Sequence, residues 1–104
     1  MRTKTAISEE THRQISEVVA RHLGKRHYRL YLFGSRAQGR STPRSDYDLG
    51  LFAERPIELA VLSQIRAELE GLRILQRVDL VDLHMSSQDL VQSVLEGGEL
   101  LDER

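Results

Sequence analysis

Three short apolar segments restrict the fold of this chain more than any other feature of its sequence. They cover residues 28–33, 47–53 and 77–83, and the first of them stops directly at Gly34. Aromatic and aliphatic runs of this length, bounded by turn residues, are typical of largely buried strands. The sequence therefore predicts three strands.

Helices are predicted around and between these strands. Ser8 with the acidic residues after it is typical of a helix start, and Gly24 is predicted to end this first helix. A second, longer helix is predicted after Pro56. Its apolar stripe is predicted to consist of Leu59, Leu62, Ile65, Leu69 and Leu72. Its solvent-facing side is predicted to hold Glu58, Arg66, Glu68 and Glu70.

A last helix is predicted in the C-terminal part of the chain. Ser86, with Asp89 three residues later, resembles a capping box that opens this helix. Residues 97–98, two glycines, are predicted to end it. The charged tail, residues 99–104, is predicted to fray apart from its two leucines.

This order of elements predicts an α/β (α+β) fold in which helices cover a small mixed β-sheet. A chain of 104 residues has room for one compact core, so residues 1–104 are predicted to form a single domain. The apolar runs are far shorter than a membrane span. Because the N-terminus lacks an apolar signal segment and the chain has no cysteine, we expect a cytoplasmic protein that does not contact a membrane.

Charge is distributed unequally along the chain. Residues 1–45 contain ten Lys and Arg against three Asp and Glu, whereas residues 46–104 contain five against thirteen. In so small a domain the two parts must fold together, which favours an anion site beside an acidic site. The same distribution disfavours a uniformly basic surface for direct nucleic-acid binding. Two differently charged, solvated faces are the simpler alternative.

The polar segment between the first two strands is the first candidate for a binding site. Gly34, at the end of a strand, allows a ligand to approach the backbone closely. Ser35, at the possible start of a short helix over residues 35–38, offers its hydroxyl and free N–H groups to an anion such as phosphate. A plain turn with a serine cap is the alternative.

Acidic residues at and within the predicted strands form a second candidate site. Asp46 and Asp48 are two residues apart, so a strand directs both side chains to one face, where a divalent cation can neutralise them. Asp79 lies in an apolar run, where an ionised carboxylate requires a partner or a metal. Asp82 competes for this role, but it is predicted to face the opposite side and to be solvated near the strand end.

The residues of these two candidate sites together resemble a known signature. A Gly-Ser pair, ten further residues and then Asp-x-Asp, from Gly34 to Asp48, is similar to the motif of the DNA polymerase beta-like nucleotidyltransferase superfamily. The resemblance is to its minimal nucleotidyltransferase (MNT) family in particular. A third strand-borne Asp, in a context similar to residues 77–81, completes the metal site in that family, which agrees with the choice of Asp79.

The resemblance implies roles for individual residues. Gly34 and Ser35 would hold the triphosphate of ATP, and Asp46 and Asp48 would bind two Mg²⁺ ions. Asp79 would ligate the catalytic metal and help to activate the acceptor hydroxyl. The chemistry is consistent, since two metals about 3.5–4 Å apart can stabilise both the attacking and the leaving oxygens of nucleotidyl transfer.

Three arginines of the same segment, Arg36, Arg40 and Arg44, are candidates for neutralising phosphate charge. Arg36 is favoured because it follows Ser35, and the other two are expected to face solvent or a partner. Tyr31 and Phe33 are predicted to be core residues. Packing or surface roles are predicted for all four histidines: His12, His22, His27 and His84.

Members of the MNT family typically act as the antitoxin of a toxin–antitoxin pair with a helical HEPN partner. The resemblance and the short chain therefore imply transfer of AMP from ATP to a hydroxyl, with a tyrosine of a HEPN-type toxin as acceptor. Two alternatives remain: a non-catalytic module that neutralises a partner by docking, and a small-molecule nucleotidyltransferase similar to the antibiotic-modifying relatives. The sequence leaves the nucleobase, the acceptor and any homo-oligomer open.

Overall fold

The computed structural model describes residues 7–34 and 46–104, and in these residues the predicted helices and strands are confirmed, with one additional strand. The elements, in chain order, are α1 (Glu9–Leu23), β1 (Tyr28–Phe33), β2 (Tyr47–Ala53), α2 (Leu59–Glu70), β3 (Val78–Asp82), the 3-10 turn η1 (Leu83–Met85), α3 (Gln88–Gly97) and β4 (Glu99–Glu103). The possible short helix over residues 35–38 lies outside the described residues.

The four strands form one mixed sheet in the order β3-β2-β1-β4. β1 pairs antiparallel with both β2 and β4, whereas β2 and β3 are parallel. The parallel pair requires a crossover, and α2 provides it. The predicted small mixed sheet is thus confirmed.

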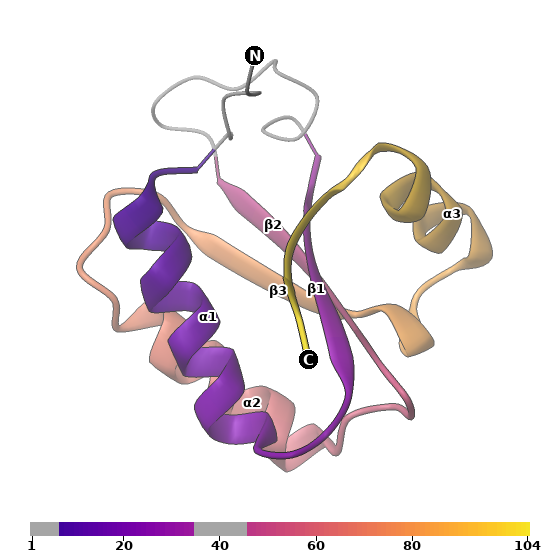
Figure 1. Cartoon of the computed structure of the whole chain (residues 1–104), viewed down its shortest axis with the longest axis horizontal. Coiled ribbons are helices and arrows are strands. Elements are labelled where there is room, and N and C mark those ends of the chain that lie inside the picture. The colour runs from indigo at the N-terminus through magenta and orange to yellow at the C-terminus, as the bar shows by residue number, and fades with distance from the viewer. Residues whose placement is uncertain (1–6, 35–45) are drawn as a thin grey trace.

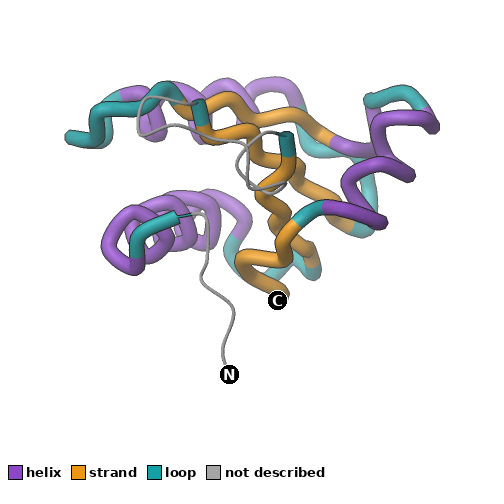
Figure 2. Tube along the Cα trace, turned by 90° about the horizontal axis from the view of Figure 1, so that it is seen from above, coloured by secondary structure: helices purple, strands orange, loops and turns teal. Residues whose placement is uncertain are grey.

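The helices lie on both faces of this sheet. α1 and α2 cover one face side by side, and α3 packs on the other (Figure 1). Seen from above, the strands run between the paired helices and the single one (Figure 2). No helix of the described residues is long and apolar enough to cross a membrane.

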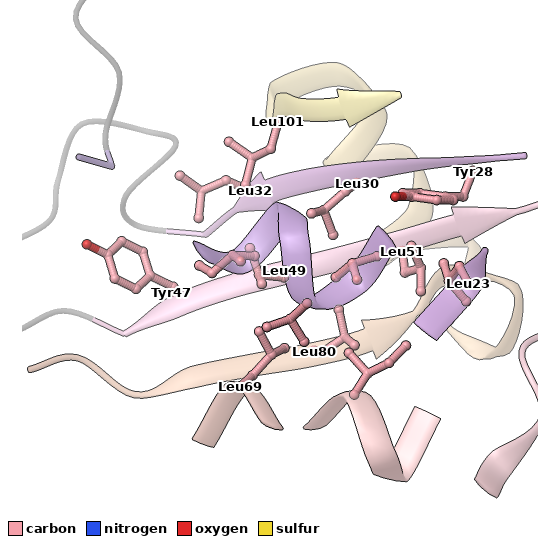
Figure 3. Close-up of a cluster of buried hydrophobic side chains, with 14 of the residues drawn as sticks. Leu23, Tyr28, Leu30, Leu32, Tyr47, Leu49, Leu51, Leu69, Leu80 and Leu101 are labelled. Atoms are coloured by element: carbon pink, nitrogen blue, oxygen red, sulfur yellow. The ribbon is translucent and has the colours of Figure 1, made fainter. Parts of the chain in front are cut away.

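The larger core lies between the sheet and the α1–α2 pair. Alternate residues of the central strands point into it, including Leu30, Leu32, Leu49 and Leu51, all fully buried (Figure 3). This alternation is the period of two that a strand imposes on its side chains. The smaller cluster under α3 contains Tyr31 and, partly buried, Phe33, so the prediction that these aromatic residues are core is confirmed.

Helix α1 begins and ends as its sequence predicts. Ser8 caps it, since the Ser8 hydroxyl accepts a hydrogen bond from the backbone N–H of Thr11. At the other end, Gly24 has a φ of 60° and donates its N–H to the carbonyl of Ala20. A positive φ is readily adopted only by glycine, which explains why the helix stops there.

Two predictions for α2 are wrong. Leu59 is 74% exposed instead of lying in the apolar stripe: it is the first residue of α2, and the buried residues of this helix start only at Leu62. Arg66 is half-buried instead of fully solvated, because its guanidinium donates two hydrogen bonds to the carbonyl of Leu80. The stripe of Leu62, Ile65 and Leu69 is confirmed.

The prediction that residues 99–104 fray is also wrong. These residues contain β4, which pairs with β1 and buries Leu101 to 7% exposure, whereas Leu100 remains 46% exposed. Strand β4 skips Leu101 in the pairing, as in a β-bulge. The freed carbonyl of Leu101 instead accepts a hydrogen bond from His12 Nε2, 2.6 Å away.

The boundaries around β3 and α3 differ slightly from the prediction. β3 is shorter, and Leu83 belongs to η1. The cap of α3 is Ser87, whose hydroxyl accepts the N–H of Leu90, whereas the predicted cap Ser86 donates its hydroxyl to the carbonyl of Asp82. The predicted end of the helix at the two glycines is confirmed.

Candidate active site

The candidate site lies at the end of the sheet where β1 stops and β2 and β3 begin (Figure 1). The strand directions bring these three chain segments to one edge. In the register, Asp48 is opposite Phe33 of β1 on one side and Asp79 of β3 on the other. Neighbouring strands lie about 4.8 Å apart, so Asp48 and Asp79 are immediate neighbours.

The acidic side chains share a face of the sheet. Tyr47 and Leu49 are buried under the α1–α2 pair, and Asp48 between them therefore points to the other face. Asp79 alternates in the same way with buried Leu80. Asp46 directly precedes β2 and is exposed, and the backbone pairing continues beside it because Tyr47 N–H donates to the carbonyl of Arg77. Asp46 also lies close enough for its charge to act on Asp48.

Gly34 packs against one of these acids. Its φ is 80°, and a Cβ atom at this position would lie only 2.5 Å from Oδ2 of Asp48. Both the backbone conformation and the space therefore require glycine. The glycine corner and the acidic residues, which the sequence analysis treated as two candidate sites, form one.

The electrostatics of Asp48 reflect this crowding. Burial raises the pKa of the Asp48 carboxyl above its ordinary value, and the charges of Asp79 and then Asp46 raise the pKa further. A divalent cation would relieve both effects, and carboxylate oxygens are ligands that Mg²⁺ prefers. The chemistry of these three residues therefore fits the implied metal.

The three carboxylates are not, however, gathered into a ready coordination shell. Among residues 7–34 and 46–104, no group of three or more His, Asp or Glu side chains surrounds a point as metal ligands do. Asp46 and Asp79 are exposed, so their side chains can turn toward a cation without disturbing the core. The backbone places the three acids near one another, and their side chains would have to rotate to bring the carboxylate oxygens onto one cation.

Asp82, the alternative to Asp79, has a structural position. Its side chain faces away from the acidic site, as predicted, but it is only 4% exposed, so the prediction that water solvates it is wrong. Its carboxylate oxygens accept the backbone N–H groups of Ile57, at 2.8 Å, and His84, at 2.9 Å. These bonds satisfy the buried charge and connect the start of α2 to the end of β3.

Four residues of the predicted phosphate site, Ser35, Arg36, Arg40 and Arg44, lie outside the described residues. Their predicted contacts with phosphate remain predictions.

The histidines take packing or surface positions where the structure describes them. Three ring nitrogens contact protein acceptors: His12 the carbonyl of Leu101, His22 the carboxylate of Glu68, and His84 the carbonyl of Ala53. The fourth, His27, is exposed.

Comparisons with known proteins agree on one family. The model of the family described as "Polymerase beta, Nucleotidyltransferase" matches residues 13–104. A curated relative, the probable protein adenylyltransferase MntA of Haemophilus influenzae, is 31% identical over 62 residues, which make up 60% of this chain and 54% of the relative. The chain thus spans about half the length of that relative.

Solved structures share the fold. A chain of a toxin–antitoxin crystal structure with AMP-PNP is 28% identical, with a TM-score of 0.73 over 89% of this chain and 73% of that one. A structure of a tri-AMPylated Shewanella oneidensis HEPN toxin in complex with an MNT antitoxin is 23% identical, with a TM-score of 0.72 over 94% of this chain and 74% of that one. At this lower identity the second likeness shows the fold alone.

Proposed function

The chain belongs to the polymerase beta nucleotidyltransferase family, whose model covers residues 13–104, and on this basis we propose that it transfers AMP from ATP to a hydroxyl group. The acceptor we propose is a tyrosine of a HEPN-type toxin, which makes this chain the antitoxin of the pair. The observation that carries the proposal is the pairing of Asp48 with Asp79 beside Gly34. Similarity to a probable protein adenylyltransferase and to a toxin–antitoxin chain supports it.

In the proposed reaction the acceptor hydroxyl attacks the α-phosphorus of ATP in line with the leaving group. A bond forms between the hydroxyl oxygen and this phosphorus, the bond from the phosphorus to the bridging oxygen of the β-phosphate breaks, and pyrophosphate leaves. Asp79 orients the hydroxyl and receives its proton. Gly34, which has no side chain, lets the triphosphate approach the backbone next to Asp48.

The proposed cofactor is Mg²⁺, with two ions held by Asp46, Asp48 and Asp79. When bound, Mg²⁺ supplies positive charge to the phosphate oxygens and so lowers the barrier to transfer. Asp46 and Asp48 would hold these ions, and Asp79 would add a further carboxylate ligand. Ser35 and Arg36 are proposed to hold the β- and γ-phosphates. Because the reaction consumes ATP, we propose that the protein acts in the cytoplasm.

The test is the intact mass of the toxin after incubation with this protein and MgATP. We expect the toxin to gain the mass of one or more AMP units, and we expect peptide mapping to place them on tyrosine. Asp46→Asn should abolish the gain, and because Asp46 is exposed, this variant should fold normally. Glu54→Gln, which removes an exposed charge away from the acids, is the matched control.

The same variant separates transfer from simple docking. If the protein neutralises its partner by binding alone, Asp46→Asn will protect cells from the toxin as well as the wild type does. If transfer is responsible, protection will be lost although the two proteins still co-purify. Transfer of AMP to an aminoglycoside, with none to the toxin, would favour the small-molecule alternative.

A further inference from the structure

Arg66 connects helix α2 to the strand that carries Asp79. Its Nε and Nη2 atoms both donate hydrogen bonds to the carbonyl oxygen of Leu80, at 3.0 and 2.9 Å. The arginine is half-buried on α2, and Leu80 is fully buried in the middle of β3. Leu80 directly follows Asp79, so this contact lies one residue from the acidic site.

The carbonyl of Leu80 needs such a partner because β3 is an edge strand. Among the described strands, β3 pairs only with β2, and the backbone carbonyl of Arg77 faces β2, since it accepts the N–H of Tyr47. Backbone groups alternate in direction along a strand, so the carbonyls of Leu80 and Asp82 face away from β2. Side chains satisfy both carbonyls: Arg66 bonds that of Leu80, and Ser86 bonds that of Asp82.

We propose that Arg66 is a positioning residue for Asp79, because its guanidinium fixes the outer side of β3 and so keeps Asp79 in register beside Asp48. The proposal rests on the proposed function for its effect on AMP transfer. The hydrogen bonds to β2 constrain only the side of β3 that faces β2. They restrict the twist of β3 less than contacts on both of its sides would. Two donors from a planar group to one carbonyl restrict that twist, which a single flexible donor does less well.

The chain offers a matched control on the opposite edge of the sheet. His12 of α1 donates a hydrogen bond to the carbonyl of Leu101 in β4, the other edge strand. The contact is of the same kind, from a helix side chain to a backbone carbonyl of an edge strand. β4 carries none of the three acids, so His12→Ala should loosen an edge strand without moving Asp79.

The first experiment compares steady-state AMP transfer by the wild type, Arg66→Ala, Arg66→Lys and His12→Ala. We expect Arg66→Ala to lower kcat about 10- to 100-fold, as small displacements of catalytic groups do, with the KM for ATP changed less than about twofold. The KM should hold because the residues proposed to contact the triphosphate, Gly34, Ser35 and Arg36, are not part of β3. Arg66→Lys should recover part of the rate, and His12→Ala should keep the wild-type kcat.

The second experiment measures amide hydrogen exchange in the absence of ATP and metal. We expect Arg66→Ala to accelerate exchange at Asp79 and Val81, whose N–H groups face β2, and His12→Ala to accelerate exchange only in β4. If Arg66→Ala does not fold, Arg66→Lys is compared with His12→Ala in both experiments.

The proposal is overturned if the Arg66 variants keep wild-type exchange in β3, or if they lower kcat no more than His12→Ala does. A wild-type protein that transfers no AMP would instead refute the proposed function. The exchange measurement would then still decide whether Arg66 holds β3 in place.

Discussion

Asp48 lies between Gly34, which directly follows β1, and its β3 partner Asp79. The sheet fixes the neighbours of Asp48 on both sides, so the negative charge of Asp79 stays close to the Asp48 carboxylate. A residue so placed weakens the folded protein unless a cation is present. A lower stability of the free protein at this position is what we expect of the proposed metal site.

Asp48→Asn should stabilise the metal-free protein at neutral pH. Because the folded protein raises the pKa of Asp48, ionisation opposes folding, and the contribution of Asp48 to stability is lost as the pH rises through the raised value. We expect the variant to gain about 0.5–1 kcal/mol in unfolding free energy, the scale of one relieved like-charge pair. Thermal or urea unfolding between pH 3 and pH 8 measures it.

The difference in unfolding free energy between Asp48→Asn and the wild type should shrink toward acid pH, where Asp48 is protonated. Glu54→Gln, which removes an exposed charge outside the site, should show no such trend. A constant difference across this pH range would show that the charge of Asp48 is not the cause.

Gly34→Ala should impair nucleotide binding by displacing the Asp48 carboxylate. The new Cβ would lie 2.5 Å from Oδ2 of Asp48, so the side chain of Asp48 must turn away from residue 34. We expect the affinity for MgATP, measured by calorimetry, to fall at least about tenfold, equivalent to about 1.4 kcal/mol.

Gly24→Ala is the control for Gly34→Ala. Gly24 also has a positive φ, but nothing lies within 4 Å of a Cβ placed there. Both variants should lose about 1–2 kcal/mol of stability from backbone strain, and only Gly34→Ala should lose affinity. Equal affinities of the two variants for MgATP would show that the contact of residue 34 with Asp48 does not cause the loss of binding.

At the scale of elements, the two edge strands are each connected to a helix of the same layer. Arg66 of α2 bonds the carbonyl of Leu80 in β3, and His12 of α1 bonds the carbonyl of Leu101 in β4. Unpaired carbonyls on an edge strand can accept hydrogen bonds from a strand of another chain. These two contacts occupy such a carbonyl on each edge and hold the helices in place across the sheet.

Leu101→Ala should destabilise the protein by about 2–5 kcal/mol, because it removes a buried side chain from the core between the sheet and α1. Leu100→Ala is the matched control on the same strand, since Leu100 is 46% exposed. It should cost less than about 0.5–1 kcal/mol. Urea unfolding of the two variants measures the difference, and similar losses would contradict the burial of Leu101 in β4.

Strand β4 also illustrates what the sequence could not predict. Local patterns were sufficient for β1 and β2, whose apolar runs are long and end in a glycine or charged residues. β4 contains only two apolar residues among acids, and its pairing depends on β1, far away in the chain. The same is true of Arg66, whose buried contact with Leu80 depends on how α2 crosses the sheet.

The acidic site was predictable in part for similar reasons. The closeness of Asp46 and Asp48 follows from their spacing in the sequence, and an acid within an apolar run drew attention to Asp79. The buried cap formed by Asp82 could not be inferred, because its partners Ile57 and His84 come from two connections that only the fold brings together. The contact of Gly34 with Asp48 likewise depends on the pairing of β1 with β2.

For the whole molecule, binding at the acidic site should appear as stability. A ligand that binds only the folded chain stabilises it by about 2.7 kcal/mol when its concentration is a hundred times Kd. We expect MgATP to raise the Tm, and ATP with a chelator to have little effect, because the three acids repel the triphosphate without a cation. Asp46→Asn should abolish the rise. An equal rise with ATP alone would argue against a metal-dependent site.

β3 can join β2 only after the chain between them has folded back as the α2 crossover. During synthesis, Asp46 and Asp48 are therefore present before the strand that carries Asp79 can pair with β2. Pairing between distant segments is slow to form, because the intervening loop must first be closed. If the proposed function holds, a nascent or half-folded copy would therefore be inactive, and activity would require the complete sheet.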